Sequence, residues 1–136
     1  MRKLTEAIML AAKVHDGQHD KAGEPYILHP LRVMLAMETE TQRIVAILHD
    51  TVEDSDDVSL DDIATAFGEE VRDAVDAMTR RDGEAYLDFV VRAKQNPVAR
   101  RVKLADVADN LSQARAASLP EHLKERYLAA RTILED

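Results

Sequence analysis

Cysteine is absent from the 136-residue sequence. Its absence excludes disulfides, cysteine-based zinc sites and thiol catalysis, so a metal would have to be held by His, Asp or Glu. Basic residues are in the minority, with 18 Lys and Arg against 26 Asp and Glu and a net charge of −8. A general nucleic-acid binder carries a basic face, so this balance predicts no nucleic-acid partner. A phosphorylated small molecule stays compatible with it, because a metal and a few local cations can reverse the field inside a pocket.

Long apolar segments are absent as well. The first residues, MRKLTE, do not lead into the apolar run of a signal peptide, and no stretch approaches the length of a membrane span. We therefore expect a cytoplasmic protein without a membrane partner. The sequence also contains no linker, low-complexity segment or internal repeat. These features predict one domain over residues 1–136, long enough to bury a hydrophobic core.

Apolar residues recur at helical spacing along the whole chain, and capping signals mark where helices start. The first expected helix covers residues 3–15 and ends at Asp16-Gly17. The other expected helices run from Pro30 through Met37, from Thr39 or Thr41 to His49, from Ser59 to near Gly68, over 69–80, over 84–95, from Pro97 through Leu111, and from Pro120 through Ile133. No strand-like alternation competes with this pattern. The predicted fold class is all-α, a compact single-domain bundle of roughly seven to eight helices.

The dipeptide His49-Asp50 ends one of the most apolar of these helices, IVAIL. Two ionisable residues at the end of so apolar a segment need partners, and a metal ion is one good partner. The alternative is an ordinary helix C-terminus, where the histidine meets the last carbonyl groups and the aspartate faces water. The dipeptide alone leaves both interpretations open.

His29 and Asp106 strengthen the metal interpretation. His29 begins a helix, and Asp106 interrupts the apolar face of another, in VKLAD. Three helices that each place a His or Asp at the edge of the core can build one site with nitrogen and oxygen ligands, although spacing does not prove convergence. Glu53 and Asp54 lie one turn beyond His49-Asp50, where they could handle a proton or orient a water molecule. Their alternative role is that of a solvated acidic loop.

Several motifs, in order, resemble the hydrolase domain of Rel/SpoT-type alarmone enzymes. Residues 17–30, GQHDKAGEPYILHP, resemble the opening motif, and residues 47–54, ILHDTVED, resemble the HD and Glu-Asp motifs. FGEEV at 67–71 and Met78-Thr79 resemble the next segments of that domain, and VKLAD at 102–106 with Asn110 resembles its final motif. The resemblance spans about residues 5–130. It implies an HD-type helical fold and a stand-alone small alarmone hydrolase.

The resemblance also implies roles for individual residues. His29, His49, Asp50 and Asp106 match the four metal ligands, which in this family usually hold Mn²⁺. By the same resemblance Glu53 and Asp54 position and activate the attacking water, and three further residues lie near the nucleotide substrate: Lys21, Asn110 and Tyr127. The implied reaction is hydrolysis of the 3′-pyrophosphate of (p)ppGpp, giving pyrophosphate and GDP or GTP.

The chain departs from the family pattern at two places. Asp20 stands where the relatives have an arginine that packs on the guanine base, and an aspartate offers no planar cation for stacking. Val107 and Asp109 replace the arginine and histidine of the final motif. The catalytic machinery is therefore expected to be intact while base recognition is altered, so an adenine alarmone or another pyrophosphorylated nucleotide is also a candidate substrate. Arg80 and its neighbour Arg81 are candidates for contacting phosphates, or else are solvated charges at a helix end.

Two other functions fit the same sequence. One is an HD phosphatase that acts on another nucleotide such as NADPH, with the same metal site and a different pocket. The other is a non-catalytic nucleotide-binding or antitoxin-like protein, against which the intact Glu53-Asp54 pair argues. A homo-oligomer is compatible with the sequence, which does not determine the oligomeric state.

Overall fold

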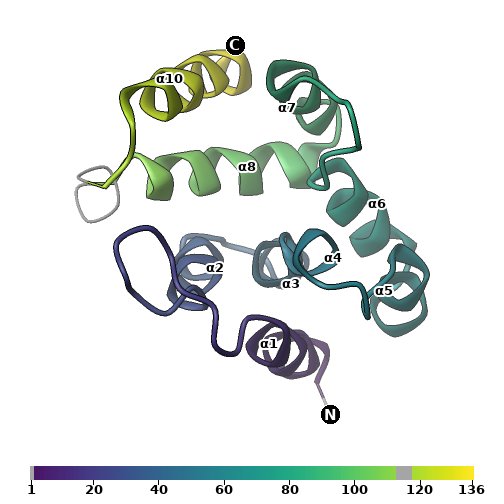
Figure 1. The fold of residues 1–136 in the computed structure, drawn as a ribbon. Coiled ribbons are helices and arrows are strands. Elements are labelled where there is room, and N and C mark those ends of the chain that lie inside the picture. The colour runs from purple at the N-terminus through teal and green to yellow at the C-terminus, as the bar shows by residue number, and fades with distance from the viewer. Residues whose placement is uncertain (1, 113–117) are drawn as a thin grey trace.

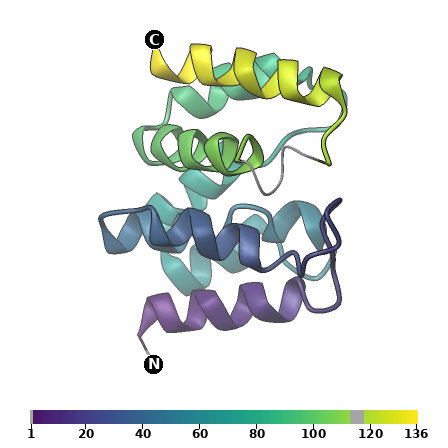
Figure 2. The ribbon, with the colours of Figure 1, turned by 90° about the vertical axis from the view of Figure 1, so that its left-hand side faces the viewer.

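The structure, a computed structural model, describes residues 2–112 and 118–136. Its regular elements are helices stacked in layers, with α1 at one end of the stack and α10 at the other (Figures 1 and 2). The described helices are α1 (Lys3–Val14), α2 (Leu28–Leu35), α3 (Glu40–Leu48), α4 (Thr51–Asp54), α5 (Leu60–Phe67), α6 (Glu69–Ala77), α7 (Tyr86–Lys94), α8 (Pro97–Asn110) and α10 (Glu121–Glu135). This architecture confirms the all-α prediction.

Side-chain caps fix three of the helix starts. Thr39, rather than Thr41, caps α3, since its hydroxyl accepts the Gln42 backbone N–H at 3.1 Å while the Gln42 side chain returns to the cap. Ser59 and Asp62 form the same reciprocal capping box on α5. Asn96 caps α8 one residue before Pro97, which occupies the first helical position. Each cap satisfies backbone N–H groups that the first turn leaves without partners, worth about 1 kcal/mol per cap.

The segment after His49-Asp50 is helical, and is not the loop of the alternative interpretation for Glu53 and Asp54. Residues Thr51–Asp54 form α4, a single helical turn, after the backbone breaks at Asp50 (φ −105°, ψ 0°). The Thr51 hydroxyl donates to the Leu48 carbonyl at 2.8 Å and so satisfies one of the last carbonyls of α3. One turn is too short to give a hydrophobic period, so the sequence pattern missed it.

The larger part of the core surrounds α3. Ile47 and Leu48 are fully buried against apolar side chains of α1, α2, α5, α6 and α8. Burying side chains of this size stabilises the fold by about 1.5–3 kcal/mol each. A smaller apolar cluster, which includes Val107 and Leu134, packs α8 against α7 and α10. Since α8 contributes to both clusters, it lies between the two groups of helices, as Figure 1 shows.

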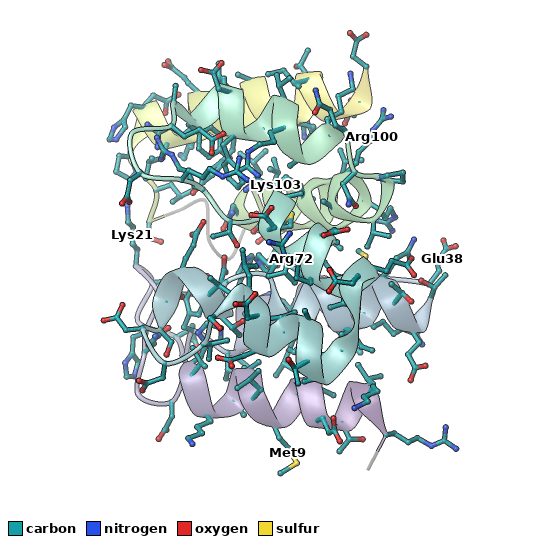
Figure 3. The ribbon with its side chains drawn as sticks, turned by 90° about the vertical axis from the view of Figure 1, so that its right-hand side faces the viewer. Met9, Lys21, Glu38, Arg72, Arg100 and Lys103 are labelled. Atoms are coloured by element: carbon teal, nitrogen blue, oxygen red, sulfur yellow. The ribbon has the colours of Figure 1, made fainter. Side chains whose placement is uncertain are left out.

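The α8 helix therefore faces α2 and α3 on one side and α7 and α10 on the other. Polar side chains gather where these helices meet, and Lys103 of α8 lies in the interior between the layers in Figure 3. Its side chain is only 8% exposed, unlike that of Met9, which projects from α1 into solvent. In the described part of the chain, no helix is both long and apolar enough to cross a membrane.

Candidate metal centre

The four predicted ligands come from two helices and one helix junction. His29 is in the first turn of α2, His49 and Asp50 join α3 to α4, and Asp106 is in the third turn of α8. The two histidine side chains are 2% exposed and that of Asp106 is 7% exposed. The packing of α2 and α8 on α3 brings together residues that lie 77 positions apart in sequence.

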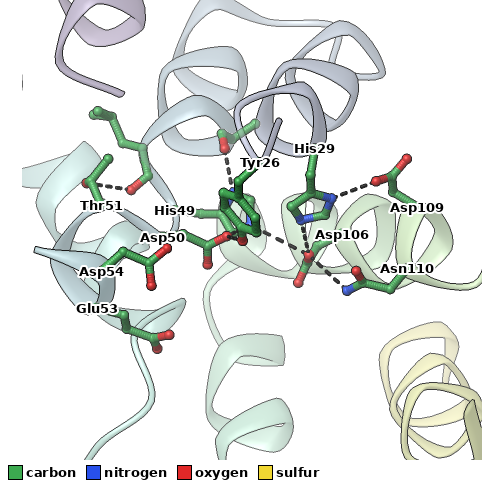
Figure 4. A network of polar contacts seen from close by, with 12 residues as sticks. Tyr26, His29, His49, Asp50, Thr51, Glu53, Asp54, Asp106, Asp109 and Asn110 are labelled. Atoms are coloured by element: carbon green, nitrogen blue, oxygen red, sulfur yellow. Dashed lines mark hydrogen bonds and ion pairs between the residues drawn. The ribbon is translucent and has the colours of Figure 1, made fainter. Parts of the chain in front are cut away.

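The four side chains point at one another (Figure 4). One ligand atom from each of His29, His49 and Asp50 lies within 4.8 Å of the others, a group that could hold a metal ion. Asp106 Oδ1 joins them, at 2.9 Å from His29 Nε2 and 3.6 Å from His49 Nε2. The donors are thus two imidazole nitrogens and two carboxylates, a set that suits divalent first-row metals and zinc.

The opposite nitrogen of each ring is held by an acceptor. His49 Nδ1 is 2.6 Å from the Ala46 carbonyl, so it must carry the proton that it donates. His29 Nδ1 is 2.6 Å from Asp109 Oδ2 and donates to it in the same way. When each ring is in its neutral form, this leaves the Nε2 lone pair directed at the shared site, which is the tautomer that a metal requires.

His49 Nε2 provides the test of whether these residues fit a metal. It is buried and has no hydrogen-bond partner of acceptable geometry in the described structure, although Asp50 Oδ2 lies 3.1 Å away. Burial lowers the pKa of His49, but the charges of Asp50 and Asp106 outweigh burial and raise the pKa well above its usual value. A buried nitrogen among surplus negative charge is the environment that a divalent cation balances. The residues therefore fit a metal ion.

Further polar side chains hold the two carboxylates. The Tyr26 hydroxyl donates to Asp50, and Lys103 Nζ donates to Asp106 Oδ2 at 2.9 Å. Asn110 donates to Asp106 Oδ1 at 3.3 Å. Burial raises the pKa of Asp106, but Lys103 and the two histidines outweigh it and keep the pKa well below its usual value. Both carboxylates are thus held ionised in fixed orientations.

Glu53 and Asp54 lie on α4 beside this site, and both are solvent-accessible (Figure 4). Partial burial raises the pKa of each, and the neighbouring charge of Asp50 adds to the rise. Glu53 Oε1 accepts the Arg80 backbone N–H at 2.5 Å, which fixes its position. Asp54 Oδ2 is 3.7 Å from Nδ1 of the buried His15. Carboxylates with raised pKa values are better proton acceptors near neutral pH than ordinary ones.

The site opens into a cavity of about 270 Å³. Predicted residues on its wall are His29, Asp50, Glu53, Arg80, Asp106, Asn110 and Tyr127. Three cationic side chains of the cavity wall lie around the Tyr86 ring. The ring centroid is 5.8 Å from the Arg80 guanidinium carbon, 5.5 Å from Lys103 Nζ and 4.9 Å from the Arg126 guanidinium carbon. An acidic chain therefore carries a local cluster of cations facing its metal-ligand group.

Lys21 does not line this cavity. It lies with Asp20 on a neighbouring cavity of about 230 Å³, which shares Tyr26 and Tyr127 with the first. Asp20 Oδ1 accepts the backbone N–H groups of Ala22 and Glu24, at 2.9 and 3.0 Å. The residue that replaces the family's arginine thus shapes its own turn.

Sequence reasoning missed four residues of the site. Tyr26 lies in the opening motif without an assigned role, and its hydroxyl donates to Asp50. Asp109 was counted only as the loss of a histidine and instead bonds His29, while Lys103 and Arg126 drew no attention. Two of them carried a signal, because Lys103 and Asp109 are each one helical turn from Asp106 and so share its face of α8.

Comparison with known proteins points to one family. The family model described as "HD domain" matches residues 7–133. The guanosine-3′,5′-bis(diphosphate) 3′-pyrophosphohydrolase of Aquifex aeolicus is 34% identical, over 80% of this chain and 17% of that protein. The GTP pyrophosphokinase of Streptomyces coelicolor is also 34% identical, over 98% of this chain and 17% of that protein. This chain thus spans about a sixth of the length of these curated relatives.

The fold has a close counterpart among solved structures. A metazoan ortholog of SpoT, described as hydrolysing ppGpp, superposes with a TM-score of 0.80 at 25% sequence identity. The match covers 98% of this chain and 84% of the other. Sequence motifs, family match and fold therefore agree.

Proposed function

This chain belongs to the HD-domain family, and we propose that it hydrolyses the 3′-pyrophosphate of (p)ppGpp-like alarmone nucleotides in the cytoplasm. The products would be pyrophosphate and GDP or GTP, or the adenine equivalents. The observation that carries the proposal is one cavity lined both by the predicted ligands His29, Asp50 and Asp106 and by the cationic side chains of Arg80, Lys103 and Arg126. The relatives named for ppGpp hydrolysis support the substrate class.

In this proposal His29, His49, Asp50 and Asp106 hold a divalent metal ion, which we infer to be Mn²⁺. When bound, such an ion acidifies water toward a pKa of about 7 and offsets charge on a phosphoryl group. Tyr26, Lys103 and Asn110 keep the carboxylates in orientation through their hydrogen bonds. The buried ligand set excludes bulk water from one side of the reacting centre.

Glu53 and Asp54 are proposed to orient the attacking water and accept its proton. Glu53 is the better placed of the two, because it lines the cavity and is fixed by the Arg80 N–H. The raised pKa of Glu53 makes its carboxylate a better acceptor for the proton of the attacking water. Asp54 is its neighbour on α4, with Oδ2 at 3.7 Å from His15 Nδ1.

The cations of the cavity are proposed to bind the pyrophosphate. Arg80, Lys103 and Arg126 line this one cavity, and each places its charge 4.9 to 5.8 Å from the Tyr86 ring centroid. Positive groups fixed in a partly desolvated pocket stabilise the charge that builds on a departing pyrophosphate. Asn110 adds an amide at the edge of the same cavity.

The nucleoside is proposed to lie toward the neighbouring cavity. Tyr26 and Tyr127 separate the two cavities, and Lys21 lines the outer one. Asp20 lines that cavity with a carboxylate that is engaged in its own turn, and it supplies no planar cation for stacking, so the substrate base need not be guanine.

A hydrolysis panel tests the proposal. Purified protein loaded with Mn²⁺ is incubated with ppGpp, pppGpp, ppApp and NADPH, and products are identified by mass. We expect pyrophosphate from at least one 3′-pyrophosphorylated nucleotide and strong loss of that activity in Glu53→Gln. Asp56→Asn, an exposed change in the same acidic stretch, is the matched control. Release of phosphate alone, or no product while Mn²⁺ is demonstrably bound, contradicts the proposal.

A further inference from the structure

Two pairs of side chains face each other between α2 and α8. His29 and Arg32 are one turn apart on α2, and Asp106 and Asp109 are one turn apart on α8. His29 Nε2 is 2.9 Å from Asp106 Oδ1 and its Nδ1 is 2.6 Å from Asp109 Oδ2. Figure 4 shows His29 lying between the two aspartates. The ring is therefore held from both of its nitrogens by the same helix.

Arg32 completes the arrangement. Its Nε donates to Asp109 Oδ1 at 2.7 Å and its Nη2 donates to Asp109 Oδ2 at 3.1 Å. A two-point contact of this kind fixes both the position and the plane of a carboxylate. The Asp109 side chain is 11% exposed and that of Arg32 is 42% exposed. The chain of contacts thus runs from the protein surface through Asp109 to a buried imidazole.

The two histidines differ in what holds their outer nitrogen. His49 Nδ1 faces a backbone carbonyl, which is neutral and moves only with α3. His29 Nδ1 faces a carboxylate, whose negative charge makes the ring a stronger ligand at Nε2 and fixes its tautomer. Arg32 restrains rotation of the Asp109 side chain through two hydrogen bonds and balances its charge.

We propose that Asp109 and Arg32 are positioning residues of the metal site, Asp109 by orienting His29 and Arg32 by holding Asp109. This inference rests on the metal site of the proposed function. It assigns a role to Asp109, which replaces a histidine of the family motif, and to a surface arginine that no motif includes. Neither residue touches the substrate or the reacting atoms in this role.

Metal affinity is the first measurement. Mn²⁺ binding is titrated for the wild-type chain and for Asp109→Ala, Arg32→Gln and Arg32→Lys. We expect Asp109→Ala to weaken binding about 10- to 100-fold. Arg32→Gln should weaken it by a smaller factor, and Arg32→Lys should restore part of the loss because the charge returns without the two-point contact. Arg101→Gln is the matched control, since Arg101 lies on the same groove between α2 and α8 but donates to the Ala36 carbonyl.

Histidine NMR is the second measurement, and a merely structural role would not produce its pattern. In Zn²⁺-loaded, ¹⁵N-histidine-labelled protein, the Nδ1 protons of His29 and His49 should both be visible. Asp109→Ala should remove the His29 signal and leave the His49 signal, which depends on the Ala46 carbonyl. If Asp109→Ala does not fold, the Arg32 series decides, because Arg32 is exposed.

The outcomes separate this inference from the proposed function. Wild-type Mn²⁺ affinity in both Asp109→Ala and Arg32→Gln overturns the inference and leaves the proposed hydrolysis intact. Normal metal binding by the wild-type chain without hydrolysis of any nucleotide overturns the proposed function, and the affinity ranking still supports the inference. A wild-type chain that binds no divalent metal overturns both.

Discussion

Replacing Lys103 by methionine should destabilise the metal-free protein more than any surface change. Lys103 Nζ is 2.9 Å from Asp106 Oδ2, and the two side chains are 8% and 7% exposed. Burial lowers the pKa of Lys103, but Asp106 outweighs burial and raises it, so the pair is ionised. Removing one partner of a buried pair costs about 3–5 kcal/mol, because Asp106 loses its lysine counter-charge and keeps only the two histidines and Asn110 as partners. Methionine keeps the length of the side chain, so the loss is one of charge rather than volume.

That cost is a large share of the roughly 5–15 kcal/mol that stabilises a typical domain. At about 3–4 °C per kcal/mol for a chain of this size, Tm should fall by roughly 10–20 °C. Urea and thermal unfolding in EDTA measure both quantities. Lys13→Met, an exposed lysine at the end of α1, should change stability by less than about 0.5 kcal/mol.

Two further measurements identify the cause. A bound divalent ion compensates Asp106 in place of Lys103, so saturating Mn²⁺ should raise the Tm of Lys103→Met more than that of the wild-type protein. Lys103→Met combined with Asp106→Asn should recover much of the stability in EDTA, because no buried charge is then left alone. A change below about 1 kcal/mol in EDTA, or no recovery in the double variant, would refute the reasoning.

The remaining predictions concern the metal, the base and one surface ion pair. His49→Ala should abolish Mn²⁺ binding and hydrolysis together, and stoichiometric Mn²⁺ in that variant would refute the ligand assignment. Glu53→Gln should lower kcat about 10²- to 10⁴-fold with Mn²⁺ affinity nearly unchanged, as measured by steady-state kinetics and titration. Hydrogen bonds from Arg92 lower the pKa of Glu84 to about 2 from 4.5. A lowered carboxyl pKa contributes stability above the unfolded value and loses it below, so the Tm difference between wild type and Glu84→Gln should shrink as pH falls from about 4.5 toward 2.

Local signals in the sequence determined the helices. The capping box at Ser59 and the Asn96-Pro97 start lie where the pattern predicts them, because a cap depends only on residues within one turn. The expected helix over 69–80 instead ends at Ala77, and the chain then turns so that the Arg80 N–H meets Glu53. This contact joins α4 to the segment that follows α6, and a local sequence pattern carries no information about such long-range contacts.

The motifs determined which residues are candidates for chemistry, and these assignments stay predictions until metal and substrate are measured. Only the tertiary structure decided that His29, His49, Asp50 and Asp106 meet, because their approach depends on how α2 and α8 pack on α3. It also decided that Asp109 faces His29. The helix period in the sequence predicts which residues share a face. Which helix packs against that face depends on long-range contacts between apolar side chains. The sequence by itself therefore determined which side chains are candidate metal ligands, and the packing of α8 against α2 and α3 determined that they form one site.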